Sequence, residues 1–228
     1  MEAVRPAESR PGAGNVFTTR IVTRRPLSPK VFELTLSRPP AFDFIAGQRI
    51  CLKLGGAERD YSIVSTPAEP DLRLCIRDVP GGLLSPQLAG APAGMALTFT
   101  GPHGYFTFKA SSRPAVFVAT GTGIAPFCSM AGSGIRGFTL IHGVATPDEL
   151  YYSAFLRLQA AAYQACLSES RPVAAGHFAG RVTDYIATHL PRRAYDFYLC
   201  GRRDMVRDVT FLVDEEFQGS LVFSEIFY

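Results

Sequence analysis

Two short segments of this 228-residue sequence carry the residue types that hold phosphate groups and flat aromatic rings. Residues 59–65 read R-D-Y-S-I-V-S, which combines a guanidinium, a phenol ring and two hydroxyls. Residues 121–126, about sixty positions later, read G-T-G-I-A-P, a glycine turn of the kind that lets a backbone approach a phosphate closely. The first segment could therefore hold a phosphate and a flat ring, and the second could hold the phosphate of another ligand. Together they predict two ligand pockets in one protein.

The first segment is expected to lie on a β-strand, whose side chains alternate between two faces. Arg59 and Tyr61 then share one face, and Ser62 lies on the other. Arg59 could hold a phosphate through a bidentate, charge-assisted pair, and Tyr61 could lie against an isoalloxazine ring. Ser62 would then sit beside the reactive N5 edge of that ring. The alternative is a plain strand with an exposed arginine and a packed tyrosine.

A second candidate phosphate site spans residues 77–85, R-D-V-P-G-G-L-L-S. It reads as the end of a strand, a Gly81-Gly82 turn and the start of a helix. Backbone N–H groups of the turn, together with the Ser85 hydroxyl, would form an anion site suited to a diphosphate. An ordinary hairpin with a serine cap is the alternative.

The glycine turn follows a fully apolar run at residues 115–120, as expected for a strand that is covered on both faces. Gly121 and Gly123 would admit a phosphate, and Pro126 suits the first turn of a helix. A plain strand-to-helix turn is the alternative. Cys200 ends a later strand, and ligands bind at the carboxyl ends of parallel strands, although a buried cysteine more often only packs.

The elements that must position these residues are of two kinds. Short apolar runs separated by Gly and Pro predict strands at residues 16–24, 31–36, 49–54, 72–76 and 96–100. Further along, strands and helices alternate. Strands are expected at residues 115–120, 137–142, 163–167, 195–200 and 221–227, helices after residue 123 and at residues 147–162, 182–188 and 205–216, and a loop at residues 173–178.

These elements predict a two-domain fold class. An N-terminal antiparallel β-barrel would bind the flavin, and a C-terminal α/β domain with a parallel sheet would bind the nucleotide. The expected divisions are a flexible tail at residues 1–15, the barrel at 16–112 and the α/β domain at 113–228.

Composition narrows the class of protein. A hydrophobic fraction of 47% and a charged fraction of 19% are normal for a globular protein, and no apolar run reaches the ~18 residues of a membrane span. The first residues lack the apolar stretch of a signal peptide. Five cysteines without a C-x-x-C pair predict reduced thiols in the cytoplasm and no metal site. A net charge of +3 is too small to indicate nucleic-acid binding.

With these motifs on the page, the chain resembles the ferredoxin–NADP⁺ reductase family of flavoproteins. The motifs R-x-Y-S-x-x-S, G-G-x-x-S, G-P-x-G-x-F, G-T-G-I-A-P and C-G-x-x-x-M occur in the family's order, and the resemblance covers about residues 17–228. It implies an oxidoreductase whose barrel binds FAD and whose α/β domain binds NAD(P)H. FMN stays open as an alternative to FAD.

The resemblance also implies which residues contact each ligand. The residues expected to contact FAD are Arg59, Tyr61, Ser62, Cys75, Ile76, Arg77, Gly81, Gly82, Leu84, Ser85, Thr122 and Tyr228. Those expected to contact the nucleotide are Gly121, Thr122, Gly123, Ile124, Pro126, Gly143, Ser168, Arg171, Cys200, Gly201 and Met205. The implied catalytic residues are Ser62, Cys200, Glu225 and Tyr228.

Four of these residues have implied roles in hydride transfer. Tyr228 is similar to the terminal tyrosine that stacks on the flavin in some family members, and it would have to move to admit the nicotinamide. Ser62 and Glu225 would orient the nicotinamide and handle the N5 proton, with the Cys200 thiol packing beside it. Glu225 lies one position further from the terminus than in the plant enzymes, so a solvated charge on an edge strand is its alternative.

The choice between NADH and NADPH stays open. In the family, an arginine in an S-R segment pairs with the 2′-phosphate of NADP, whereas this chain has Glu169 at that position. A carboxylate repels a 2′-phosphate, but Arg171, His177 and Arg181 could compensate.

The electron acceptor is expected to be a separate protein, since the chain has no cysteine cluster for iron–sulfur binding and no haem signature. A ferredoxin or flavodoxin could dock on a basic face, for which the candidates are Arg20, Arg24, Arg25, Lys30, Arg192, Arg193, Arg202 and Arg203. The same residues could be ordinary solvated charges. A free-flavin or quinone reductase and a non-catalytic flavin- and nucleotide-binding subunit are the alternative functions.

Overall fold

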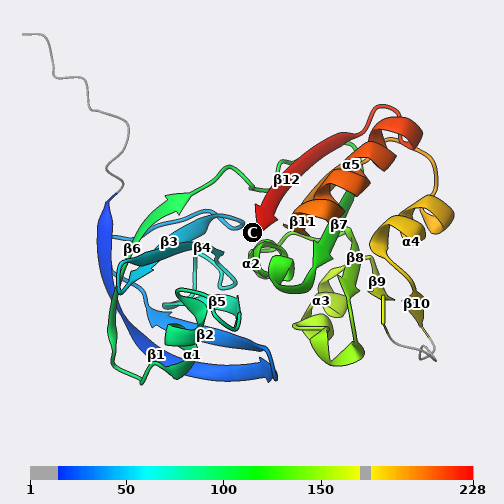
Figure 1. Ribbon diagram of the computed structural model, residues 1–228. Helices are drawn as coiled ribbons and strands as arrows, with labels where there is room; N and C mark the ends of the chain where they lie inside the picture. The colour runs from blue at the N-terminus through cyan, green and yellow to red at the C-terminus, as the bar shows by residue number, and fades with distance from the viewer. Residues whose placement is uncertain (1–14, 170–175, 228) are drawn as a thin grey trace, which may run out of the picture.

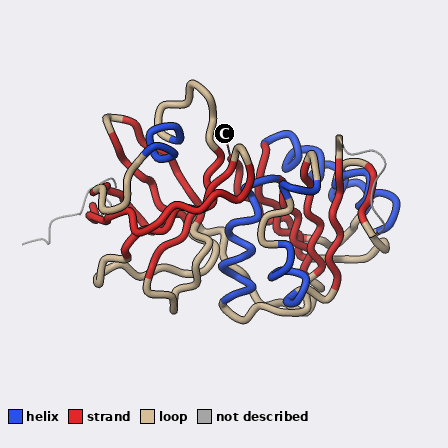
Figure 2. The backbone as a smooth tube through the Cα atoms, turned by 90° about the horizontal axis from the view of Figure 1, so that it is seen from below, coloured by secondary structure: helices blue, strands red, loops and turns tan. Residues whose placement is uncertain are grey.

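The computed structural model describes residues 15–169 and 176–227, which form two β-sheets lying side by side (Figure 1). The sheet made by β1 to β6 is at the left, and the sheet with most of the helices is at the right. Seen from below, the two blocks of strands are again separate (Figure 2). No helix among the described residues is both long and apolar enough to cross a membrane.

The first sheet is antiparallel, with the strand order β4-β3-β6-β1-β2-β5. An isolated bridge between Ile63 and Leu74 joins its two edges, so the sheet closes into a barrel. Alternate side chains such as Leu34, Ile50 and Phe99 are fully buried in its interior. Its elements are β1 (Val16–Ser28), β2 (Val31–Ser37), β3 (Arg49–Leu54), β4 (Ala57–Ser62), β5 (Asp71–Arg77), the helix α1 (Ser85–Gly90) and β6 (Ala96–His103).

The second sheet is parallel throughout, with the strand order β10-β9-β8-β7-β11-β12. Its strands are β7 (Ala115–Thr120), β8 (Thr139–Val144), β9 (Ala162–Leu167), β10 (His177–Ala179), β11 (Asp196–Arg202) and β12 (Leu221–Phe227). Its helices are η1 (Gly121–Ile124), α2 (Ala125–Gly132), η2 (Pro147–Glu149), α3 (Ser153–Gln159), α4 (Val182–His189) and α5 (Arg203–Glu216). Both halves of the expected fold class are confirmed.

The central strand β7 shows why its sequence is apolar without interruption. Val116 and Val118 pack into one hydrophobic cluster with residues of α4 and α5. Phe117 and Ala119 face the opposite cluster with residues of α2 and α3. Helices therefore cover both faces of the sheet, and the four central side chains of the strand are buried on one face or the other.

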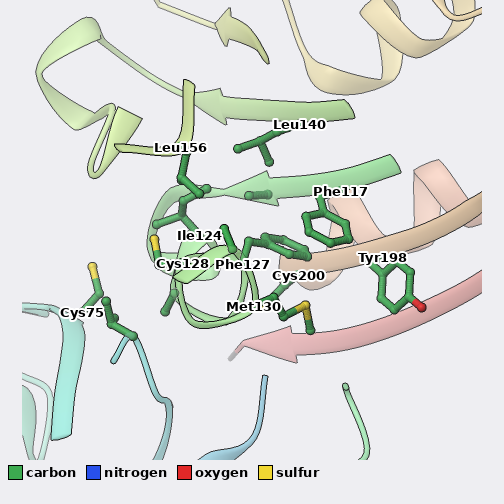
Figure 3. Packing of buried hydrophobic residues seen from close by; sticks show 14 of the residues in the cluster. Cys75, Phe117, Ile124, Phe127, Cys128, Met130, Leu140, Leu156, Tyr198 and Cys200 are labelled. Atoms are coloured by element: carbon green, nitrogen blue, oxygen red, sulfur yellow. The ribbon is translucent and has the colours of Figure 1, made fainter. Parts of the chain in front are cut away.

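The cluster on the α2 side also joins the two halves of the molecule. It contains Val31, Cys75 and Phe106 of the N-terminal half together with Phe117, Phe127 and Tyr198 of the C-terminal half. Figure 3 shows Cys75 on the barrel side, next to the labelled residues that belong to α2 and the parallel sheet. A buried hydrogen bond from the Ser129 hydroxyl to the Ser65 carbonyl, 2.7 Å long, crosses the same boundary.

The helix expected at residues 147–162 is wrong in extent. The chain forms η2, then turns at Tyr152, which has φ +57°, and only then begins α3, which ends at Gln159. Tertiary contacts explain the break. The Tyr151 hydroxyl lies 3.1 Å from the Ser28 hydroxyl, and the Tyr152 hydroxyl donates to Glu33 at 2.9 Å. Both contacts attach this turn to the barrel, which a continuous helix would not allow.

Other boundaries also shift. The strand expected at residues 137–142 is observed as β8 two residues later, and the first strand continues to Ser28. The loop expected at residues 173–178 lies partly outside the described residues, but His177 begins the edge strand β10. Three residues are too few to show the alternation by which a strand is predicted.

Candidate functional site

The carboxyl ends of the parallel strands meet the barrel at the centre of the molecule. The tip of β12 reaches this junction in Figure 1. Because all six strands of this sheet run in the same direction, the ends of β7, β11 and β12 lie at one edge. That edge is where ligands bind in open α/β sheets.

Three side chains form a hydrogen-bonded group at this junction. The Ser62 hydroxyl of β4 donates to Oε2 of Glu225 at 2.8 Å, and Nη1 of Arg49 donates to Oε1 of the same carboxylate at 2.9 Å. The other side of the Arg49 guanidinium donates from Nε to Asp60 at 2.9 Å. Glu225 is only 7% exposed. The alternative interpretation of this residue, a solvated charge on an edge strand, therefore does not apply. Ser62 and Glu225, 163 positions apart, are brought together by the fold alone.

The charge on Glu225 is balanced between two opposing effects. Burial raises the pKa of this carboxyl above its ordinary value, whereas the hydrogen bonds from Ser62 and Arg49 and the charge of Arg49 lower it. Such a group can exchange a proton closer to neutral pH than an exposed carboxylate can.

Cys200 lies next to Glu225. The two residues are register partners on the adjacent parallel strands β11 and β12. The Cys200 side chain is completely buried, and burial together with the neighbouring Glu225 charge raises the pKa of its thiol well above the usual value. The raised pKa favours the neutral thiol over a reactive thiolate, and a packing role beside the nicotinamide stays a prediction.

The glycine turn after β7 packs directly on the end of β11. A Cβ atom placed on Gly123 would lie 2.2 Å from the carbonyl oxygen of Cys200, so only glycine fits. The Thr120 hydroxyl accepts a hydrogen bond from the backbone N–H of Arg202, which fixes the two strand ends to each other. Gly121, with φ +54°, has open space where its Cβ would be. The turn thus presents accessible backbone at Gly121 and Thr122, as close approach of a phosphate requires.

The other expected nucleotide residues differ in accessibility. Ile124 and Pro126 are buried beneath the turn, as is Met205 at the start of α5, so these three support the turn by packing. Gly143 and Gly201 are buried and allow close approach to the Val182 and Thr120 side chains, respectively. Ser168 and Glu169 are exposed at the end of β9. Arg171 and Tyr228 lie outside the described residues.

On the barrel side, most of the expected flavin residues lie on β4, on β5 and in the turn after β5. The two strands are joined by the Ile63–Leu74 bridge and by a 2.7 Å hydrogen bond from Val64 N to Arg73 O. Beyond that bridge the described residues show no further strand pairing between β4 and β5, whose facing ends carry Arg59 and Arg77. Both arginines are exposed, and neither has a carboxylate partner among the described residues. Two available guanidiniums fit a ligand that carries phosphates.

The remaining barrel residues contribute in different ways. Tyr61 is partly buried against the barrel core, and burial raises the pKa of its phenol to about 12, so it stays neutral. The side chains of Ile76 and Leu84 fill the barrel core, so their contacts with a ligand would be made by the backbone. Cys75 faces the cluster between the two halves.

The turn at residues 79–85 has a defined geometry. The N–H of Gly82 donates to the Val79 carbonyl at 2.8 Å, and the N–H of Val79 donates to the Ser85 hydroxyl at 3.1 Å. Gly81 has φ +75° with open space around it. The Ser85 hydroxyl thus accepts a hydrogen bond within the turn and does not cap α1, whose N-cap residue is Leu84. Its remaining donor capacity is what a diphosphate would use.

Two functional candidates were missed in the sequence. Arg49 could have been found from the Gly55-Gly56 turn, because a two-residue hairpin sets the register that places Arg49 opposite Ser62.

The second missed residue, His142, is fully buried within β8, two residues before the strand ends. Its Nδ1 lies 2.9 Å from the Tyr163 hydroxyl, and its Nε2 has no hydrogen-bond partner among the described residues. Burial lowers its pKa to about 4, against the effect of the Gly121 backbone, so a neutral imidazole adjoins the glycine turn.

The expected basic docking face is not a single surface. Arg192 and Arg193 precede β11, whereas Arg202 ends it, so they lie at opposite edges of the sheet. Arg25 is paired with Glu33, and Arg192 is paired with Glu216. Among the described residues, no group of three or more His, Cys, Asp or Glu side chains is arranged to hold a metal ion.

Comparison with known proteins adds two family matches. The oxidoreductase FAD-binding domain matches residues 20–108, and the oxidoreductase NAD-binding domain matches residues 117–210. Ferredoxin–NADP reductase B of Sorangium cellulosum is 36% identical over 193 residues, covering 77% of each chain. The toluate 1,2-dioxygenase electron transfer component of Pseudomonas putida is 34% identical over 181 residues, covering 73% of this chain and 53% of the relative. The chain thus spans only about half the length of that relative.

Solved structures share the fold over nearly the whole chain. The ferredoxin NADP⁺ reductase from Neisseria gonorrhoeae with bound FAD and NADP has a TM-score of 0.79 and 21% identity, over 92% of this chain and 98% of that one. Amycolatopsis cytochrome P450 reductase GcoB has a TM-score of 0.83 and 24% identity, over 94% of this chain and 71% of that one. Both show the same two-domain architecture.

Proposed function

The chain belongs to the ferredoxin–NADP reductase family, and we propose from this that it passes electrons from NAD(P)H, by way of FAD, to a ferredoxin- or flavodoxin-like protein. As a member of that family it is an NAD(P)H-dependent flavoprotein oxidoreductase with FAD as its cofactor. The direction of transfer to a protein partner is supported by relatives that are named as electron-transfer or reductase components.

The observation that carries this function is the convergence of two candidate binding regions on one buried group. The unpaired ends of β4 and β5 carry the exposed Arg59 and Arg77, and the glycine turn after β7 offers its backbone. Between them lie Ser62 and Glu225, joined by a 2.8 Å hydrogen bond. A ring held by the barrel and a ring held by the parallel sheet would meet at this group.

FAD, when bound, accepts a hydride from the nicotinamide and gives up its electrons one at a time. The contribution of this chain is to bind and orient. Arg59 and Arg77, with the turn at Gly81, would hold the phosphates of FAD, and Tyr61 would pack against its ring. Ser62 would donate a hydrogen bond or relay a proton at the N5 edge, with Glu225 as the group that takes up or supplies it. Cys200 would limit the space for the nicotinamide and exclude water.

Further expectations remain proposals. Tyr228 would cover the flavin until the nucleotide displaces it, and the two domains would divide at residue 112. Five free cysteines, four of them buried, are in keeping with the cytoplasm as the compartment.

An absorption spectrum followed by anaerobic titration tests this function. The protein, purified and reconstituted with FAD, should show flavin bands that bleach on addition of NADPH or NADH. The reduced protein should then be reoxidised faster by a ferredoxin or flavodoxin than by free flavin or a quinone. If neither nucleotide bleached the flavin bands, the reductase function would be contradicted. If a free flavin or a quinone reoxidised the protein faster than a ferredoxin or flavodoxin, the small molecule would be the electron acceptor in place of a protein.

A further inference from the structure

We propose that Arg49 is a positioning residue that holds the Glu225 carboxylate on the Ser62 hydroxyl and ties β12 to the barrel. This inference rests on the proposed function, because Ser62 and Glu225 affect turnover only if the flavin and the nicotinamide meet beside them. Arg49 belongs to none of the motifs by which the chain resembles its family.

The geometry leaves the Glu225 carboxylate little freedom. Its Oε2 accepts from Ser62 at 2.8 Å, and its Oε1 accepts from Nη1 of Arg49 at 2.9 Å. Arg49 is itself held from the other side, where Nε donates to Asp60 at 2.9 Å. With both oxygens occupied, the carboxylate is fixed in one orientation, and each of these bonds is charge-assisted.

The surrounding backbone leaves space for this guanidinium. A Cβ atom on Gly104, which has φ +87°, would lie 2.5 Å from Nη1 of Arg49 and 3.5 Å from Oε1 of Glu225. The strand pairing places Arg49 opposite Ser62 in β3 and β4, so the arginine and the serine approach the carboxylate from adjacent strands. Arg49 and Glu225 are 176 positions apart, so their pair connects the barrel to the last strand of the parallel sheet.

Among the described residues, the groups whose charge acts on Glu225 come from three strands, and His103 of β6 is the register partner of Arg49. Arg49 of β3 is the nearest positive charge, Asp60 of β4 is a more distant negative charge, and the Cys200 thiol of β11 is neutral. Burial raises the pKa of Glu225, and Arg49 opposes that increase. Without Arg49 the carboxyl would hold its proton to higher pH, and a protonated carboxyl is a weaker acceptor for Ser62.

The first experiment uses the protein without cofactor. A carboxyl whose pKa is higher in the folded than in the unfolded protein binds more protons when folded, so its stabilising effect decreases as the pH rises through that window. Arg49→Gln should raise the pKa of Glu225 further, and so widen the pH range over which the folded protein loses stability as the pH rises. Its Tm should therefore be close to that of the wild type near pH ~5 and lower by about 5 °C near pH ~8.

The same measurement in a Glu225→Gln background isolates the pair. There the Glu225 carboxylate is absent, so the pH dependence of the decrease should disappear. Arg49→Gln should then cost only the exposed Arg49–Asp60 pair, which lowers the Tm by no more than about 3 °C and by the same amount at both pH values. An equal decrease in both backgrounds would overturn the proposal, because Arg49 would then stabilise the fold without acting through Glu225.

The second experiment uses the FAD-loaded protein in stopped flow. Arg49→Gln should reduce the flavin about tenfold more slowly than the wild type near pH ~7, with nucleotide affinity unchanged within about twofold. Arg49→Lys, which can still donate to Glu225, should recover part of the rate. The matched control is Arg113→Gln, which breaks a pair of similar burial between Arg113 and Asp196, at the other end of β11. This control should lower the Tm and leave the rate of flavin reduction unchanged.

A wild-type rate in Arg49→Gln, or an equal loss of rate in Arg113→Gln, would overturn the proposal. These outcomes are distinct from failure of the proposed function. If wild-type protein did not reduce flavin at all, the reductase function would fail, whereas the coupling of Arg49 to Glu225 in the cofactor-free protein would still be measurable.

Discussion

Single residues at this site differ in whether their charge already has a partner. Glu225 is buried and receives donors on both oxygens, which is the condition under which a protein tolerates a buried carboxylate. Arg59 and Arg77 are exposed and have no carboxylate partner among the described residues. The environment of Glu225 suits a group that takes up and releases protons. Arg59 and Arg77 are available to bind an anionic ligand.

Arg59→Ala should weaken FAD binding by about 10- to 100-fold, because one charge-assisted contact to a phosphate is worth roughly 1.5–3 kcal/mol. Quenching of flavin fluorescence on titration with the cofactor-free protein measures this affinity. Arg20→Ala removes another exposed arginine of the barrel, on β1, which pairs with neither β4 nor β5, and should leave the affinity unchanged. Equal losses of FAD affinity in the two variants would mean that the affinity depends on net charge and not on a contact between Arg59 and a phosphate.

Glu169→Arg should raise the preference for NADPH over NADH by about tenfold, since it replaces a repulsive charge near the expected 2′-phosphate with an attractive one. Glu169 is exposed at the end of β9, and its backbone N–H donates to Ala145, so the substitution leaves the core intact. Steady-state kcat/KM for the two nucleotides gives the ratio. An unchanged ratio would show that the 2′ pocket lies elsewhere.

At the scale of elements, two glycine turns determine how strands meet. The Gly55-Gly56 turn sets the pairing of β3 with β4, and so places Arg49 opposite Ser62. The Gly121–Ile124 turn lets the chain pass directly over the end of β11 at Gly123. In each case two strand ends of the site lie close together because a glycine turn allows that geometry.

Gly123→Ala should lower the Tm by about 4–8 °C, because its Cβ would lie 2.2 Å from the Cys200 carbonyl and the turn would have to shift. The same shift should weaken nucleotide binding by about tenfold. Gly90→Ala is the control, since a Cβ there meets nothing within 4 Å and the residue lies in α1. Thermal unfolding and nucleotide titration measure both effects, and equal Tm values for the two variants would contradict the packing argument.

At the scale of the whole molecule, the site exists because two halves are held at a fixed orientation. A shared hydrophobic cluster joins them, and polar contacts fix their rotation. The clearest of these is the buried Glu33 carboxylate of β2, which is bound by Arg25, Arg73 and the Tyr152 hydroxyl. Tyr152 adopts a left-handed backbone conformation to make this contact, which costs of order 1–3 kcal/mol that the surroundings must offset.

Tyr152→Phe should lower the Tm by about 4 °C, because it removes a hydrogen bond to a buried charge between the two halves. It should also slow flavin reduction by a few-fold, since small changes in the distance between bound rings have large effects on rate. Tyr185→Phe, on α4 and stacked on His189, is the control and should change neither value. A Tyr152 variant with wild-type stability would show that the halves do not depend on this contact.

Much of the fold could be predicted from local patterns. The apolar run of β7, the alternating strands of the barrel and the glycine turns each follow from short-range geometry. The break in the helix near Tyr152 could not be predicted, because its cause is a hydroxyl bonded to Glu33, which is 119 positions away. The short strand β10 escaped notice because three residues carry no period.

The sequence alone determined the kinds of chemistry present, since residue types and local spacing decide whether a turn can approach a phosphate or a strand can present Arg59 and Ser62 on opposite faces. Only the tertiary structure decided that Ser62 and Arg49 both donate to the buried carboxylate of Glu225. Their contact depends on how two sheets pack against each other, and packing is a property of the whole chain that no short segment encodes.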